Sequence, residues 1–237
     1  MAGRVIEITS FYEKVQRHCA DYASDCEPDF SIITSQADID YERYLEEKCA
    51  AAEGRPVREY TDQYREDIAV YRMIAEKMTA YDTFLFHSSA VAVDGQGYLF
   101  TAKSGTGKST HTRLWREYFG DKAIMINDDK PLIQITETGA VIHGTPYNGK
   151  HRIGNKISVP LKAVCILERA EENHIERITK ADAYTMLVQQ ILRPREPAQM
   201  AKTMQLIDKL AERVELYRLG CNMDISAAEV AYNGMKG

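Results

Sequence analysis

The spacing of apolar and polar residues divides the chain into a helical first part and a part rich in strands. In the first part, one apolar stripe with helical spacing predicts a long helix over Thr61–Tyr81, with Thr61 placed to cap it. The stretch Ala50–Pro56 is expected to be a loop. The shorter elements expected in this part are strands at Val5–Thr9 and Phe30–Thr34 and helices at Phe11–Tyr22 and Ala37–Cys49.

From residue 82 onward, short apolar runs alternate with turn signals such as Asp94–Gly97 and Glu137–Gly139. Strands are expected at Thr83–Val93, Tyr98–Lys103, Ala123–Asn127, Pro131–Thr136, Ala140–His143, Val159–Glu168, Ile175–Thr179 and Val214–Leu219. Helices are expected at Thr112–Phe119, Ala181–Leu192, Ala198–Arg213 and Ile225–Lys236. This mixture predicts an α/β fold with a mixed sheet, in which residues 1–82 form an N-terminal α/β addition packed on a core at 83–237.

Composition and charge narrow the functional classes. With 44% hydrophobic and 27% charged residues, the chain can bury a substantial core. The net charge of −5 argues against general binding to nucleic acid or to an anionic membrane. Because no apolar run is long enough to span a membrane and the first ten residues lack a signal-peptide core, we expect a cytoplasmic protein. The five cysteines form no Cys-x-x-Cys pair and predict reduced thiols.

A glycine-rich stretch, Ala102–Thr110, stands between an expected strand and an expected helix. That setting is typical of a P-loop, whose backbone N–H groups and helix N-terminus form a pocket for phosphate. Lys108 is placed to contact the β- and γ-phosphates, and Ser109 offers a hydroxyl to Mg²⁺. The residues expected to bind a nucleotide are Ser104, Gly105, Thr106, Gly107, Lys108, Ser109 and Thr110.

This loop departs from the usual motif at one position, because Ala102 replaces the first glycine. Alanine fits there only if its φ is negative. The alternative is a chance Gly-Lys-Ser in a surface turn, which the flanking strand and helix disfavour.

Three further groups stand at regular distances from the loop. His87 lies 21 residues before Lys108, and Asp128 and Asp129 lie 20 and 21 residues after it. Each follows an expected strand, and strand ends in an open α/β sheet converge on the ligand site. Taken singly, His87 fits a core histidine and the Asp pair a solvated turn. Their joint spacing instead predicts a shared site, in which carboxylates hold Mg²⁺ or accept a hydroxyl proton.

Together, the motifs HSSAV (87–91), SGTGKST (104–110) and NDD (127–129) give the chain a family resemblance. They resemble the nucleotide-binding core shared by HPr kinase/phosphorylase and ATP-dependent phosphoenolpyruvate carboxykinase. The stretches Gly144–Lys150 and Val159–Ala163 are similar to short HPr-kinase-like proteins of bacteria. The resemblance covers roughly residues 83–170 and implies a mixed-sheet P-loop core of that type with flanking helices.

The resemblance implies an ATP-dependent kinase that moves the γ-phosphoryl group to a hydroxyl, with ATP and Mg²⁺ required. Asp128, Asp129, His87 and Lys108 are then the catalytic candidates, and Ser109 and the Asp pair are the metal candidates. In this assignment Asp128 orients or deprotonates the acceptor, while His87 lies near the transferred group as a metal-shell or acid–base residue.

Several basic residues near these motifs are candidates for contact with phosphate or substrate: Arg113, Lys130, Lys150 and Arg152. Arg113 equally fits a solvated helix face. The basic stretch Gly144–Lys150 is typical of a lid or an acceptor clamp, or of a plain connection between strands. Arg193 and Arg195 fit a grip on an anionic substrate, but are interpreted as part of a charged linker between helices.

The expected partner is a hydroxyl-bearing acceptor, which is a peptide, a protein or a small molecule, without nucleic acid or membrane; the sequence leaves room for a homo-oligomer. Two other functions stay open. A nucleotide-binding regulator without transfer chemistry would need neither His87 nor both aspartates. A carboxykinase-like lyase is disfavoured because the chain, at 237 residues, is far shorter than that enzyme.

Overall fold

The computed structural model describes residues 1–149 and 152–237, which form two compact units. One unit comprises Gly3–Lys77 together with Met1, and the other comprises Met78–Gly237 together with Ala2. The expected organisation into an addition at 1–82 and a core at 83–237 stays a prediction.

The N-terminal unit combines a two-stranded parallel sheet with helices. Its elements are β1 (Ile6–Thr9), α1 (Glu13–Cys19), the 3₁₀ turn η1 (Ala20–Tyr22), β2 (Phe30–Ile33), α2 (Gln36–Glu53) and α3 (Asp62–Met78). The buried Glu66 of α3 fixes the chain that leads into α1. Its carboxylate accepts hydrogen bonds from the backbone N–H groups of Phe11 at 2.7 Å and Tyr12 at 2.9 Å. A buried carboxylate thereby gains the partners that it needs.

Helix α2 continues further than the sequence indicates. It runs to Glu53 and ends at Gly54, which takes the left-handed conformation with a φ of 62°. The loop expected at Ala50–Pro56 is therefore wrong for its first four residues. The alanines that begin it are strong helix formers, and the actual terminator is the glycine that follows them.

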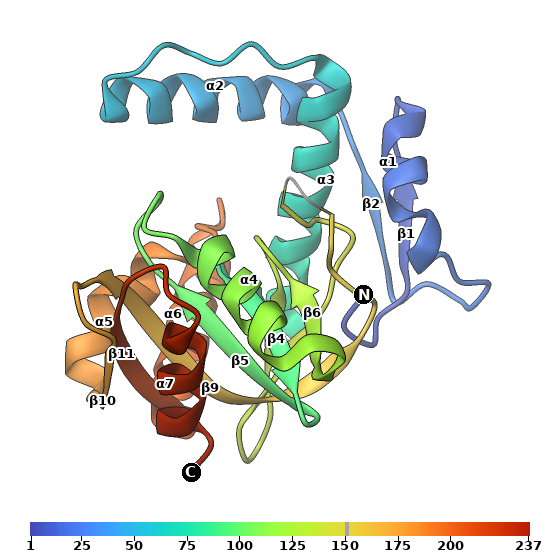
Figure 1. Ribbon diagram of the computed structural model, residues 1–237. Helices are drawn as coiled ribbons and strands as arrows, with labels where there is room; N and C mark the ends of the chain where they lie inside the picture. Colours follow the sequence, from blue (N-terminus) through green and yellow to red (C-terminus); the bar gives the residue numbers. More distant parts are fainter. Residues whose placement is uncertain (150–151) are drawn as a thin grey trace. The chain divides into compact units, whose positions relative to one another are not determined.

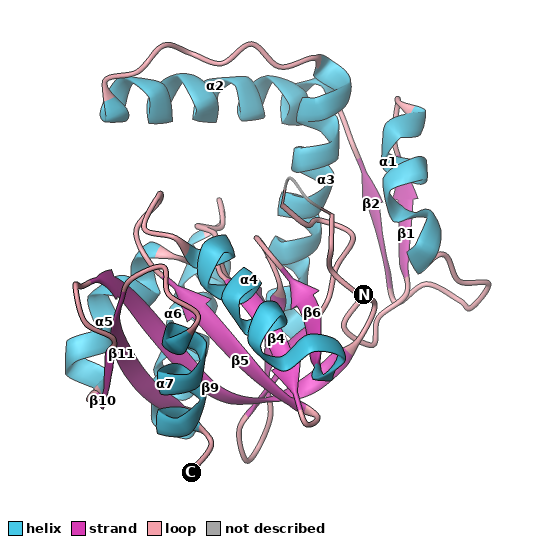
Figure 2. Cartoon of the chain, viewed as in Figure 1, coloured by secondary structure: helices cyan, strands magenta, loops and turns pink. Residues whose placement is uncertain are grey.

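The described part of the C-terminal unit is built on a nine-stranded mixed sheet. Its strands are β3 (Thr83–Leu85), β4 (Ser89–Val93), β5 (Gln96–Thr101), β6 (Ala123–Asn127), β7 (Leu132–Ile135), β8 (Ala140–His143), β9 (Ser158–Arg169), β10 (His174–Arg177) and β11 (Glu215–Cys221). The order across the sheet is β3-β7-β8-β9-β5-β4-β6, with β11 paired to β9 and β10 paired to β11. Strand β9 is long and curved (Figure 2). It pairs with β8 near its start and with β5 further along, and so joins two parts of the sheet.

Helices cover both faces of this sheet. They are α4 (Lys108–Phe119), α5 (Lys180–Gln189), α6 (Pro197–Arg213) and α7 (Ser226–Met235), with 3₁₀ turns η2 (Thr79–Tyr81) and η3 (Gly120–Lys122). Along β5, Tyr98 and Phe100 pack in the cluster of α4 and α7, while Leu99 packs in the cluster of α5 and α6. Helices α4 and α7 lie side by side over one face (Figure 1). Because successive side chains of β5 point to opposite faces of the sheet, each pair of helices packs on its own face.

The predicted α/β fold with a mixed sheet and flanking helices is confirmed. The apolar run Thr83–Val93 forms two strands with different neighbours, because β3 pairs with β7 whereas β4 pairs with β5 and β6. Strand β10 pairs with the distant β11. Among the residues described, no helix has both the length and the apolar character to cross a membrane.

The fold brings three chain segments to one edge of the sheet. Strands β5 and β6 each pair antiparallel with β4, which lies between them. The ends of β5 and β6 therefore lie beside the start of β4. The glycine-rich loop follows β5, His87 precedes β4, and the Asp pair follows β6.

Candidate functional site

The glycine-rich loop forms a tight turn between β5 and α4. Gly105 and Gly107 have φ values of 77° and 122°, where a residue with a side chain would be strained. The N–H of Thr106 donates to the Lys103 carbonyl at 3.2 Å and closes the turn. Ala102 is fully buried and is not in the left-handed region, so the missing first glycine is accommodated.

The first turn of α4 suits an anion. The helix begins at Lys108 after Gly107, which supplies no side-chain cap, and the first turn holds no acidic residue. Helix N-terminal N–H groups have no partner within the helix and carry a partial positive charge. Ser109 is exposed in this turn and Thr110 is half-buried. These features are those of a phosphate site.

Lys108 is a half-buried cation with little to compensate its charge. Its Nζ donates to the Ala102 carbonyl at 3.2 Å. Burial lowers the pKa of Lys108, and the charge of Asp129 offsets only part of that effect. An anion bound in the loop would therefore stabilise the charged lysine.

His87 and Asp129 meet at the same edge. His87 Nε2 lies 3.3 Å from Asp129 Oδ1, and the Ser88 N–H donates to the Asp129 carbonyl at 3.0 Å. Burial alone would raise the pKa of Asp129. The hydrogen bond from His87 and the nearby positive charges, led by that of Lys130, outweigh burial and hold the pKa below its ordinary value. Asp129 is thus an ionised carboxylate among cations, with its side chain still 33% exposed.

Asp128 has very different surroundings. It is only 5% exposed, and its Oδ1 accepts a hydrogen bond from the Gly149 N–H at 2.5 Å. A Cβ at position 149 would lie 2.8 Å from the other carboxylate oxygen, so glycine is required for this approach. Asp128 therefore holds the segment that follows β8, whereas Asp129 faces His87 and Lys108.

Asn127 organises the turn that carries both aspartates, and the sequence interpretation had not counted it as a site residue. Its Oδ1 accepts hydrogen bonds from the N–H groups of Asp129 at 2.9 Å and Lys130 at 2.7 Å. Its Nδ2 donates to the Thr145 hydroxyl at 3.0 Å. The available signal was an asparagine directly before the pair, since asparagine side chains commonly bind the backbone two residues on.

Two contacts, one at the loop and one at His87, were also missed. Arg169, the last residue of β9, donates from Nη2 to the Gly105 carbonyl at 2.8 Å. The segment before Arg193 runs beside His87, because the His87 N–H donates to the Gln190 carbonyl at 2.8 Å. The sequence offered no signal for either contact, since both depend on long-range pairing.

The remaining predicted residues divide into those at the site and those turned from it. Lys130 Nζ lies 3.9 Å from Asp129 Oδ2. Arg113 instead forms an ion pair with Glu117 on the exposed side of α4. Arg152 is exposed, with a φ of 48°, and its N–H donates to the Gly149 carbonyl at 3.2 Å. Ser104 is exposed and Thr106 half-buried in the loop, while Lys150 lies outside the described residues.

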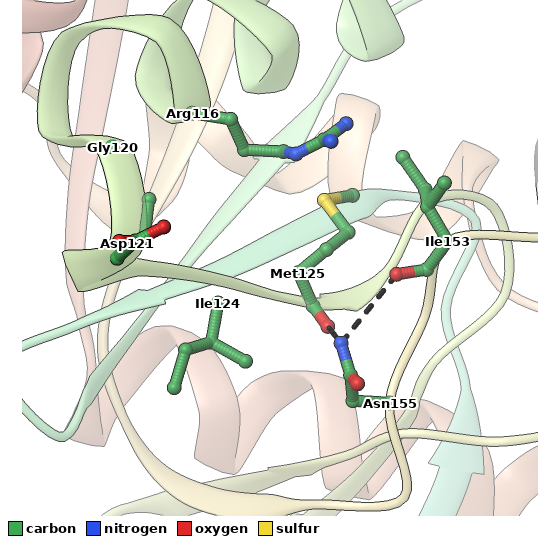
Figure 3. Close-up of a pocket in the computed structure, with 8 residues that line it drawn as sticks. Arg116, Gly120, Asp121, Ile124, Met125, Ile153 and Asn155 are labelled. Atoms are coloured by element: carbon green, nitrogen blue, oxygen red, sulfur yellow. Dashed lines mark hydrogen bonds between the residues drawn. The ribbon is translucent and has the colours of Figure 1, made fainter.

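A separate pocket of about 430 Å³ lies at the other end of α4 (Figure 3). It is lined by Arg116, Gly120, Asp121, Ala123, Ile124, Met125, Ile153 and Asn155. Asn155 Nδ2 donates to the Met125 carbonyl at 2.8 Å and thereby joins the pocket wall to β6. None of the predicted catalytic residues lines this pocket.

The described residues contain no group of three or more His, Cys, Asp or Glu side chains arranged to hold a metal ion. A Mg²⁺ ion in such a loop needs no protein cage, because it usually binds one or two carboxylates together with substrate phosphates. The Ser109 hydroxyl and the Asp129 carboxylate are of the right chemistry for that role.

Comparison with known proteins identifies the family to which the chain belongs. The family model described as SynChlorMet cassette protein ScmC matches residues 61–227, which is most of the chain, and the chain belongs to this family. A comparison with curated proteins finds no match. Among solved structures, the Hpr(Ser) kinase/phosphatase from Coxiella burnetii is similar at a TM-score of 0.36 and 9% identity, over 65% of this chain and 99% of that one. A likeness of this size supports no argument about activity.

Proposed function

We propose that this member of the ScmC family is an ATP-dependent phosphotransferase that moves the γ-phosphoryl group of Mg·ATP to a hydroxyl. One observation carries the proposal: Asp129 lies against His87, 3.3 Å from its Nε2, and acts electrostatically on Lys108 of the glycine-rich loop. A phosphate-binding cation and an ionised carboxylate beside it are the two groups that transfer to a hydroxyl requires.

In this proposal, the loop N–H groups and Lys108 hold the β- and γ-phosphate oxygens. The acceptor oxygen attacks the γ-phosphorus, the bond to the β–γ bridging oxygen breaks, and ADP leaves. Asp129 orients the acceptor hydroxyl and takes its proton. Mg²⁺, held by the Ser109 hydroxyl and by phosphate oxygens, would supply charge neutralisation at the phosphates.

The surroundings of the two aspartates support roles that differ from those suggested by the sequence. Asp128 is buried and committed to the Gly149 N–H, so we assign it to positioning the 144–149 segment. Asp129 is more exposed and faces the loop, so we assign it to the acceptor. His87 keeps Asp129 ionised and oriented. The acceptor is proposed as a peptide, protein or small molecule with a hydroxyl group.

Lys108→Ala tests the phosphate site. Charge-assisted hydrogen bonds to phosphate are worth about 1.5–3 kcal/mol, so calorimetry should show Mg·ATP affinity reduced about tenfold or more. Lys122→Ala, at an exposed position in η3, is the matched control and should bind as the wild type does. Equal Mg·ATP affinity in Lys108→Ala and wild type would contradict the assignment of this loop as a P-loop.

Transfer itself is tested with γ-labelled ATP and panels of seryl peptides and hydroxyl metabolites, followed by mass spectrometry of the product. Slow hydrolysis of ATP provides a readout that needs no acceptor, because water can take the place of the hydroxyl. Binding of Mg·ATP with neither hydrolysis nor transfer would instead favour the alternative function, a nucleotide-binding regulator without transfer chemistry.

A further inference from the structure

The strand order separates the two sides of the glycine-rich loop. On one side of β5 lie β4 and β6, which carry His87 and Asp129 at this edge. On the other side lie β9 and β11, both parallel to β5. The reacting γ-phosphate belongs beside Asp129, so the rest of a nucleotide bound across the loop must extend toward the ends of β9 and β11.

Strand β9 extends beyond the end of β5 and runs beside the glycine-rich loop. Thr101, the last residue of β5, is level with Ile166, and β9 continues three residues further to Arg169, which is level with Cys221 of β11. Arg169 is exposed, and its Nη2 donates to the Gly105 carbonyl at 2.8 Å. Its guanidinium therefore links the loop to the ends of β9 and β11.

The segment after β11 has a fixed backbone. Asn222 Oδ1 accepts the Asp224 N–H at 3.0 Å, and Asp224 Oδ1 accepts the Ser226 N–H at 2.9 Å. The backbone of Asn222 is also held in place, because its N–H donates to Asn173 Oδ1 at 2.9 Å. This is a segment held by side-chain hydrogen bonds and not a loose connection.

Two large apolar side chains are nevertheless exposed on this segment. Met223 is 78% exposed and Ile225 is 45% exposed. They stand beyond the carboxyl end of β11, on the side of the loop away from Asp129. Met223 and Ile225 are thus the apolar groups that this segment offers to a ligand that extends from the loop past Arg169.

We propose that Met223 and Ile225, together with Arg169, form the surface on which the base of the nucleotide lies. The inference rests on the proposed function and adds the site of the base to it. The thioether of Met223 and the guanidinium of Arg169 both interact favourably with an aromatic ring face, and Ile225 adds apolar contact. Because every base has such a face, this surface binds purine nucleotides with little choice between adenine and guanine.

The double variant Met223→Ser/Ile225→Ser tests this surface with two probes, Mg·ATP and magnesium tripolyphosphate. Contact of a methionine sulfur with an aromatic ring is worth about two- to twelvefold in affinity, so calorimetry should show Mg·ATP binding weakened by at least about that factor. Binding of tripolyphosphate should not change, because it has no base. Ile124→Ser, at a 47% exposed position on β6, is the matched control and should bind both probes as the wild type does.

The outcomes separate this inference from the proposed function. Unchanged Mg·ATP affinity in the double variant overturns the base surface, while tripolyphosphate binding that still depends on Lys108 leaves the phosphate site standing. An equal loss for both probes would mean that the segment supports the loop and does not contact the base. Wild-type protein that binds neither probe would overturn the inference and the proposed function together.

Discussion

Helix α4 carries a different set of groups at each of its two ends. At the N-terminal end, positive-φ glycines, a half-buried lysine with a lowered pKa and an ionised Asp129 surround uncapped helix N–H groups. At the C-terminal end lies the pocket of about 430 Å³, lined by Arg116, Asp121 and apolar residues of β6. The N-terminal end therefore carries the groups that suit a phosphate, whereas the C-terminal end carries the pocket.

The difference shows which features indicate a phosphoryl-transfer site. A phosphate needs donors and positive charge more than it needs an enclosed volume, because most of its contacts come from backbone N–H groups and cations. The C-terminal end of a helix presents carbonyl groups and a partial negative charge, which repels phosphate. Arg116, in the last turn of α4, is well placed to neutralise that partial charge. The hollow at this end is thus a poor candidate for the triphosphate.

Asp129→Asn should give the largest effect on this comparison. The amide keeps the shape of the side chain but loses the negative charge that accepts a proton, so transfer or ATP hydrolysis should fall about 10²–10⁴-fold. Affinity for Mg·ATP should change far less. Single-turnover assays with γ-labelled ATP, run beside calorimetry, separate the two effects.

The matched variant is Asp128→Asn at the neighbouring position. Its amide oxygen can still accept the Gly149 N–H, so its rate should fall much less than that of Asp129→Asn. A larger loss in Asp128→Asn that added Mg²⁺ does not recover would restore the sequence-based assignment and make Asp128 the carboxylate that acts on the acceptor.

His111→Gln probes the buried face of α4 close to its N-terminal end. His111 is 2% exposed, accepts a hydrogen bond from Trp115 Nε1 at 3.0 Å, and has a pKa lowered by burial to about 3. An unfolded histidine has a pKa of about 6.5. The folded protein therefore resists protonation of His111, and the contribution of this histidine to stability is fully present above about pH 6.5 and is lost as pH falls toward 3.

Between pH 6 and pH 4, the free energy of unfolding of the wild type should fall about 1.4 kcal/mol per pH unit more steeply than that of His111→Gln. The glutamine oxygen can still accept the Trp115 N–H. Urea unfolding at several pH values measures the slope, with His174→Gln at an exposed position of β10 as the matched control. Equal slopes in wild type and His111→Gln would contradict a buried neutral histidine.

Much of this arrangement was readable from the sequence where local signals are strong. Strand β6 was predicted with its observed bounds, Ala123–Asn127, because a run of apolar residues ends at an Asp pair. The glycine-rich loop was also readable, since glycine spacing reports backbone conformation directly. The end of helix α2 was not, because it depends on the conformation of one glycine, Gly54.

The unequal surroundings of Asp128 and Asp129 could not be predicted. The two residues are identical and adjacent, and the difference arises from Gly149, which is 21 positions away in the chain. Arg169 was missed for a similar reason: its contact with Gly105 requires the register between β9 and β5, which local patterns do not contain. Long-range pairing, and not local propensity, sets these features.

Arg116→Ala should give the smallest effect and tests the other end of α4. The substitution removes a charge from the wall of the pocket in Figure 3. Because we place the phosphates and the base elsewhere, Mg·ATP affinity and ATP hydrolysis should stay within about twofold of wild type, as expected for a surface change away from a site. The lost interaction with the helix end should cost about 0.3–1 kcal/mol of stability, and Arg116→Lys should retain most of it. A tenfold loss of Mg·ATP affinity in Arg116→Ala, measured by calorimetry, would move part of the nucleotide site to this pocket and erase the contrast between the two ends.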